Sequence, residues 1–157
     1  MKFAAAIATV AALFGSAEAG LEIVGLQNLD LVAVPEQGLK AHEYVNQWRK
    51  DNGLQPLAWN QKLVDIGLPH SMYQAKKGYT SHDGWDKRRK ATGAGQAYEN
   101  TAYNRLFRDP AKQAYNNWLM STGHRQNMLR TGCDKEGIAV VYDTDTKGYW
   151  FTEIITN

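Results

Sequence analysis

Apolar side chains recur every three to four residues through the first half of the chain, which is the period of a helix with one buried face. The pattern predicts a first helix over residues 39–51, which Gly53 brings to an end. It predicts a second helix over residues 60–78, and Pro69 is expected to bend this helix near Leu68. The first half therefore contributes two amphipathic helices.

The last third of the chain is rich in β-branched and aromatic residues instead. Residues 137–142 and 148–155 predict an antiparallel hairpin around a polar turn that contains glycine. Residues 98–103 predict a third strand, and residues 109–121 predict a helix that starts with a cap residue and a proline. Together these elements predict an α+β fold in which helices cover a small antiparallel sheet.

The N-terminus has the features of an export signal. Lys2 precedes an apolar stretch, and small residues surround an expected cleavage position after Ala19. We therefore divide the chain into a signal peptide at 1–19, an extended leader at 20–38 and one domain at 39–157. The apolar stretch is too short for a transmembrane segment, and no later stretch is long enough. These features predict a soluble, secreted protein.

Charge and cysteine usage narrow the range of partners. The 18 basic and 16 acidic side chains give a net charge of +2, and no basic stripe alternates with aromatic residues. We therefore expect no nucleic-acid partner, and we expect a monomer. The cations at 87–90 are interpreted as a solvated turn, with contact to an anionic headgroup as the alternative. The single cysteine, Cys133, is interpreted as a buried thiol rather than an intermolecular bridge.

Three polar residues are candidates for chemistry: His82, Glu99 and His124, in that order along the chain. Two neutral imidazoles can hold a transition metal, and a nearby carboxylate can either add a third ligand or orient one of the rings. Gly123 frees the backbone directly before His124, and the helical run that follows would hold this imidazole in place. The three residues predict a divalent-metal site, with weakly bound zinc as the expected ion.

At these residues the chain resembles the SCP or CAP domain family of cysteine-rich secretory proteins, insect venom antigen 5 and plant pathogenesis-related proteins. The run 118–129 matches the pattern Trp-x-x-Ser-x-Gly-His-Arg-x-Asn-hydrophobic-Leu of the bacterial-type branch. Further likeness runs from Val45 to Phe151 and covers nearly all of the mature chain. The resemblance implies a three-layer α-β-α sandwich without disulfides, in which the two histidines and Glu99 line one cleft.

Two departures from the family pattern affect the site. Tyr98 replaces the glycine that usually precedes the motif's Glu, so the carboxylate of Glu99 can be aimed differently. Ser121 stands where animal members have a second Glu, and a serine hydroxyl is a poor metal ligand. The resemblance therefore implies a His-Glu-His cleft to which Ser121 adds a hydrogen bond and no metal ligand.

The resemblance also implies a secreted, non-enzymatic protein that binds an apolar ligand, such as a sterol or a fatty acid, in a groove separate from the metal cleft. Trp85 is the candidate ligand-binding residue. It lies beside the basic run in the segment 83–96, which is expected to be a long mobile connector. An apolar ring next to cations suits a ligand with an apolar body and a polar head.

One alternative is a metal-assisted hydrolase in which the two cleft histidines hold zinc and Glu99 acts as the base. Hydrolysis is not general in the family and the second Glu is missing, so the non-enzymatic interpretation is favoured. His70 is interpreted as a buried, hydrogen-bonded histidine rather than a ligand. His42 precedes Glu43, but Asn46 stands where a zinc protease needs its second histidine, which excludes that motif.

Overall fold

The computed structural model describes residues 31–157, so the expected signal peptide at 1–19 lies outside the described residues. Five helices and five strands occur in the described range. The helices are α1 (Pro35–Asp51), α2 (Gln61–Lys77), α3 (Trp85–Thr92), α4 (Pro110–Met120) and α5 (Thr122–Met128). The strands are β1 (Leu31–Ala33), β2 (Ala58–Trp59), β3 (Ala97–Arg105), β4 (Lys135–Asp143) and β5 (Gly148–Thr156).

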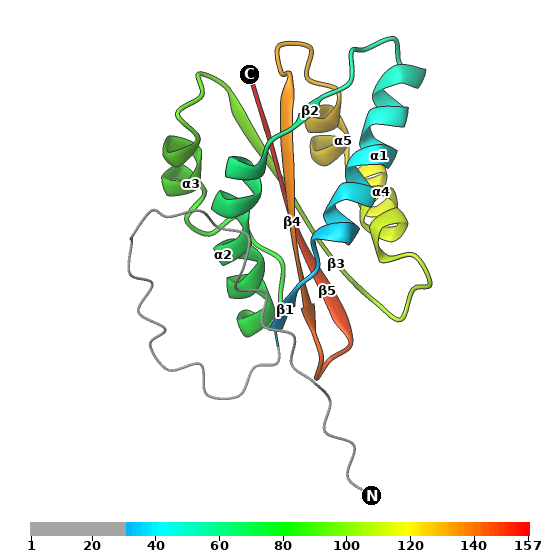
Figure 1. The fold of residues 1–157 in the computed structure, drawn as a ribbon, viewed down its shortest axis with the longest axis vertical. Coiled ribbons are helices and arrows are strands. Elements are labelled where there is room, and N and C mark those ends of the chain that lie inside the picture. Colours follow the sequence, from blue (N-terminus) through cyan, green and yellow to red (C-terminus); the bar gives the residue numbers. More distant parts are fainter. Residues whose placement is uncertain (1–30) are drawn as a thin grey trace, which may run out of the picture.

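The strands form one sheet with helices on both faces. Its order is β1-β4-β5-β3 with antiparallel neighbours throughout, and the short β2 pairs in parallel with the start of β4. Helices α1, α4 and α5 lie on one side of the sheet and α2 and α3 on the other (Figure 1). The predicted α+β, three-layer arrangement is therefore confirmed, including the hairpin of β4 and β5 and the third strand, β3.

Alternation along β4 and β5 supplies both inner faces of the sandwich. Ile138 and Phe151 belong to the core cluster on the side of α1 and α4, and both are fully buried. On the other side α2 packs directly against β4 at Gly137, where a Cβ atom would lie 2.6 Å from the backbone nitrogen of Val64. A side chain at this position would push α2 off the sheet, so the glycine sets the close approach of the two elements.

Local signals fix both ends of α2 as predicted. The side chain of Asn60 accepts a hydrogen bond from the backbone of Leu63 and caps α2, which ends at Gly78 in the left-handed region (φ 75°). Pro69 does not interrupt α2, which continues through it as one helix. Proline removes one backbone hydrogen bond, and the contact of α2 with β4 and β5 compensates for that loss.

Two segments expected to be irregular are ordered elements. Residues 31–38 of the predicted leader form β1 and the first turn of α1, so the folded domain starts before residue 39. The segment 83–96, expected to be a mobile connector, contains α3. Cys133 is a free, buried thiol, as interpreted from the sequence. Within residues 31–157 no helix is long and apolar enough to cross a membrane.

Candidate functional site

Three separate segments bring the candidate residues together at the β3 edge of the sheet. Glu99 lies on β3, His82 lies in the loop between α2 and α3, and His124 lies in the first turn of α5. His82 Nδ1 is 2.9 Å from Glu99 Oε1, and the rings of His82 and His124 are 6.0 Å apart between centroids at an angle of 67°. The three residues that the sequence singled out therefore share one site.

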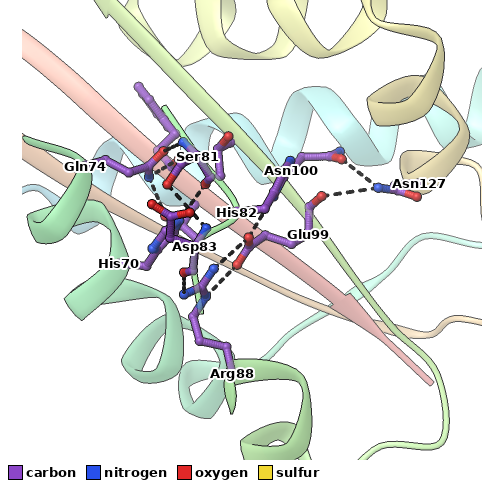
Figure 2. Close-up of polar contacts among 12 residues, drawn as sticks. His70, Gln74, Ser81, His82, Asp83, Arg88, Glu99, Asn100 and Asn127 are labelled. Carbon is purple, nitrogen blue, oxygen red and sulfur yellow. Dashed lines mark hydrogen bonds and ion pairs between the residues drawn. The ribbon is translucent and has the colours of Figure 1, made fainter. Parts of the chain in front are cut away.

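Side chains of α2 hold the loop that carries His82. His70 Nε2 lies 2.7 Å from the backbone oxygen of Ser81, and Gln74 Oε1 accepts a hydrogen bond from the Ser81 backbone nitrogen at 3.2 Å (Figure 2). Burial lowers the pKa of His70, so it is neutral at neutral pH and donates from Nε2. His70 is thus the buried, hydrogen-bonded histidine that the sequence predicted, and it positions the residue next to His82.

The carboxylate of Glu99 is fully engaged by its neighbours. Arg88 donates from Nε to Glu99 Oε2 at 2.7 Å and from Nη2 to Oε1 at 2.9 Å, as Figure 2 shows. Burial alone would raise the pKa of Glu99, but the hydrogen bonds from His82 and Arg88, together with the charge of Arg88, outweigh it and lower the pKa. Glu99 is therefore an ionised, ion-paired group.

This engagement decides what Glu99 contributes to a metal site. Its oxygens point to His82 Nδ1 and to the guanidinium group, and among residues 31–157 no three His, Cys, Asp or Glu side chains are placed together to hold a metal ion. Of the two roles that the sequence left open, the geometry favours the orienting one. A carboxylate bound to Nδ1 leaves Nε2 of His82 as the metal-binding nitrogen.

The ring of His124 lies half-buried, and its backbone is held at both ends. Ser121 caps α5 by accepting a hydrogen bond from the His124 backbone nitrogen at 3.5 Å, and Asn100 Nδ2 donates to the His124 backbone oxygen at 3.0 Å. Burial, followed by the nearby His82, lowers the pKa of His124, which favours the neutral imidazole. Ser121 therefore acts on the site through the backbone.

Sequence reasoning missed three residues that support the site. The sequence places Arg88 among the cations of a solvated run, although in a helix it falls on a different face from its exposed neighbours and only 12% of its side chain is exposed. Asn127 Nδ2 donates to the backbone oxygen of Glu99 at 3.3 Å and to Asn100 Oδ1 at 2.9 Å. Both asparagines lie within the two motifs, which was the signal available in the sequence.

A separate cavity of about 510 Å³ lies between α2 and α3. Ile66, Pro69 and Ala91 give it apolar walls, and Arg88 and Lys87 line it as well. Trp85 does not line this cavity. Its half-buried ring lies 6.0 Å from the guanidinium carbon of Arg88, a cation–π distance. Arg88 thus stands between the cavity and the His82–Glu99 pair.

The comparison with protein families agrees with this fold. The model of the cysteine-rich secretory protein (CAP) family matches residues 42–154, which include every residue of the site, and the chain belongs to that family. No match was found among curated proteins.

Solved structures from three bacteria are similar. An outer surface protein from Borrelia burgdorferi has a TM-score of 0.71 at 16% identity, over 83% of this chain and 98% of that one. An extracellular protein containing an SCP domain from Bacillus anthracis has a TM-score of 0.66 at 25% identity, over 78% and 40%. A cysteine-rich secretory protein from Staphylococcus aureus has a TM-score of 0.60 at 24% identity, over 78% of this chain and 39% of that one. The chain thus spans about two fifths of the last two proteins.

Proposed function

We propose that this protein is a secreted, non-enzymatic binding module that takes a divalent transition metal, such as zinc, weakly between His82 and His124, and an apolar ligand in a separate place. The observation that carries the proposal is the state of Glu99. An ionised carboxylate held by Arg88 and by His82 Nδ1 orients a metal-binding imidazole, and it has no free oxygen for base chemistry. The extracellular and outer-surface descriptions of two similar structures support export.

The spacing of the two imidazoles suits a shared ion. Two histidines bound to one tetrahedral zinc through nitrogens about 2 Å from the metal have ring centroids about 5 Å apart. The rings of His82 and His124 lie 6.0 Å apart, and half of the His82 side chain is exposed, so a small rotation closes the difference. Two protein ligands leave the other positions to water, and binding is weaker than at a closed structural site.

A hydrolase would require a base near the metal. Glu99 is ion-paired, and the hydroxyl of Ser121 caps α5. We expect no turnover of ester, peptide or phosphoester substrates by the zinc-loaded protein. The measurement is a broad substrate screen with and without chelator. Turnover that the chelator abolishes and that Glu99→Gln also removes would replace the binding module with a metal-assisted hydrolase.

Arg88 is expected to limit the metal affinity, because it places a positive charge beside the site and draws Glu99 away from the ion. Arg88→Gln should therefore lower the zinc dissociation constant about tenfold, equivalent to about 1.4 kcal/mol. Titration calorimetry measures it. Arg89→Gln is the matched control. The Arg89 side chain is 49% exposed, and its ion pair with Asp86 is long, at 3.9 Å, and therefore weak. An unchanged constant in Arg88→Gln would show that Glu99 is not restrained by this ion pair.

The cavity between α2 and α3 is the best-supported place for the apolar ligand. Its walls are largely apolar, which suits the body of a fatty acid or a sterol, and its charged border consists of Lys87, Arg88, Asp65 and Asp83. Because it is separate from the His82–His124 cleft, chelation of the metal should not affect the ligand. Trp85 is proposed to act on this site through Arg88, whose guanidinium group its ring flanks.

A fluorescent fatty-acid and sterol assay tests this assignment. Ala91→Trp fills the cavity and should weaken binding about tenfold or more, since a blocked pocket no longer buries the ligand. Lys90→Trp, which adds the same ring at an exposed neighbouring position, should bind as the parent does. Trp85→Ala should weaken binding less, and EDTA and His124→Ala should have no effect. Absence of binding by the parent would end the apolar-ligand proposal, and loss in His124→Ala alone would move the ligand into the metal cleft.

A further inference from the structure

A row of polar side chains, hydrogen-bonded at each of its two ends, runs through the protein interior on the α1 side of the sheet. It begins with Asn46 and His42 on α1, continues through Glu136 on β4 and Glu153 on β5, and ends at Asn100 on β3. Glu136 and Glu153 are both completely buried. Two buried carboxyl groups side by side are costly unless every oxygen has a partner, so the hydrogen-bond pattern around them carries information.

Backbone groups fix the direction of the hydrogen bonds at the α1 end. Asn46 Oδ1 accepts from the backbone nitrogen of Leu57 at 2.7 Å, and its Nδ2 donates to the backbone oxygen of Leu57 at 3.0 Å. The amide orientation follows from these two contacts. The second hydrogen on Nδ2 points to His42 Nε2 at 3.0 Å, so Nε2 accepts. His42 therefore carries its proton on Nδ1 and donates it to Glu136 Oε2.

Backbone groups also fix the direction at the β3 end. Asn127 Nδ2 donates to the backbone oxygen of Glu99 and to Asn100 Oδ1, which makes Asn100 Oδ1 an acceptor. Asn100 Nδ2 then donates one hydrogen to the backbone oxygen of His124 and the other to Glu153 Oε2. Donors thus converge on the two carboxyl groups from both ends of the row.

One oxygen of each carboxyl group remains. Glu136 Oε1 and Glu153 Oε1 are buried and receive no hydrogen bond from any donor in residues 31–157. The register places Glu136 opposite Ile155 and Glu153 opposite Ile138, so the two side chains are diagonal neighbours on one face, close enough for a side-chain hydrogen bond. If neither Oε1 atom carried a proton, two oxygen lone pairs would face each other. If both carried one, two hydrogens would face each other. One proton satisfies both atoms.

We propose that Glu136 and Glu153 hold a single shared proton between their Oε1 atoms, and that this buried proton anchors Asn100 and, through it, the first turn of α5 that carries His124. The effect on metal binding rests on the proposed function of the His82–His124 cleft. The proton site itself does not depend on it.

The electrostatic surroundings agree with one retained proton. Burial raises the pKa of both carboxyl groups, and the charge of Glu136 raises that of Glu153 further. The charged groups that face the pair come from α1: Arg49, which donates only to backbone oxygens, and His42, whose pKa is lowered by burial although the charges of Glu153 and Glu43 partly oppose that shift. The elements β3 and α5 contribute amide groups and the backbone of His124.

The shared proton makes stability depend on pH with a defined sign. The folded chain keeps a proton that an unfolded glutamate releases near its usual pKa of 4.5. The contribution of this proton to the stability of the fold is therefore complete below pH 4.5, and it is lost as the pH rises toward the raised pKa of the pair. Between about pH 7.5 and 8, roughly nine-tenths of each unfolded histidine is already deprotonated and most of the unfolded cysteine thiol is still protonated. In this window the folding equilibrium constant should fall about tenfold per pH unit because of this one proton.

Glutamine variants test the proposal directly, through denaturant unfolding as a function of pH. In Glu153→Gln, and equally in Glu136→Gln, one amide hydrogen replaces the shared proton and the net charge of the pair is kept. Each single variant should fold and should lose most of the pH dependence between about pH 7.5 and 8. A parent protein without that dependence, or single variants that retain it or fail to fold, would overturn the proposal.

The double variant adds a second, independent outcome. With both residues changed to glutamine, the NH2 groups of the two side-chain amides face each other. Rotating either amide by 180° would break its contact with His42 or with Asn100. Its unfolding equilibrium constant should rise at least about tenfold beyond the product of the two single effects. Its zinc affinity should fall, while the single variants bind as the parent does. An additive double variant contradicts the shared proton. If the parent binds no zinc, the proposed function fails, and the unfolding data still decide the proton site.

Discussion

Trp118→Ala is expected to lower the free energy of unfolding by about 3–5 kcal/mol, as large-to-small changes at fully buried aromatic positions do. The side chain is completely buried and packs edge-to-face on Phe151, with 6.3 Å between the ring centroids. Its Nε1 donates to the backbone oxygen of Thr101 at 3.1 Å. The change leaves a cavity between α4 and the sheet and removes the partner of a buried oxygen. Within residues 31–157 there is no disulfide to offset this loss, since the one cysteine is a free thiol.

Denaturant unfolding measures the effect, and Met120→Ala is the matched control. Met120 lies at the end of the same helix and is 85% exposed, so its removal should change the stability by less than about 0.5 kcal/mol. Similar values for the two variants would mean that Trp118 does not hold α4 on the sheet.

The combined change His82→Ala and His124→Ala is expected to abolish measurable zinc binding, because it removes both imidazole ligands and leaves Glu99 in its ion pair with Arg88. Titration calorimetry of parent and variant gives the comparison. Tyr79→Ala is the control, since Tyr79 lies in the same loop as His82 and is 51% exposed. Zinc binding that persists in the double variant with parental affinity would place the metal elsewhere.

The sequence predicted those parts of the fold that local chemistry determines. Asn60 and Asp109 cap α2 and α4 through their side chains, and the residues around the Gly-containing turn form the β4–β5 hairpin. These signals act within a few residues, so they can be recognised without knowing the rest of the structure.

The parts that the sequence did not predict depend on distant partners. Helix α3 lacks an apolar face, and the pairing of Arg88 with Glu99 connects it to β3. Glu136 and Glu153 stand two residues from Ile138 and Phe151 on the same face of the sheet, but nothing local in the sequence indicated that they would be buried as a pair. Their partners come from α1 and β3, far away in the sequence. Such contacts follow from the packing of layers, which no local pattern contains.

The sequence predicted which residues form the candidate site, but not which role the carboxylate has in it. The order His, Glu, His indicated three converging residues, and the structure brings His82, Glu99 and His124 to one edge of the sheet. Whether the carboxylate would bind a metal or orient a ring depended on Arg88, whose helix the sequence did not predict.

Anomalous scattering from a zinc-soaked crystal tests the central claim most directly, because it locates the ion and its ligands in one measurement. We predict one strong peak between the imidazoles of His82 and His124, about 2 Å from a ring nitrogen of each, with Glu99 still paired to Arg88 and bound to His82 Nδ1. A peak coordinated by the Glu99 carboxylate, or the absence of a peak between the two rings, would contradict it.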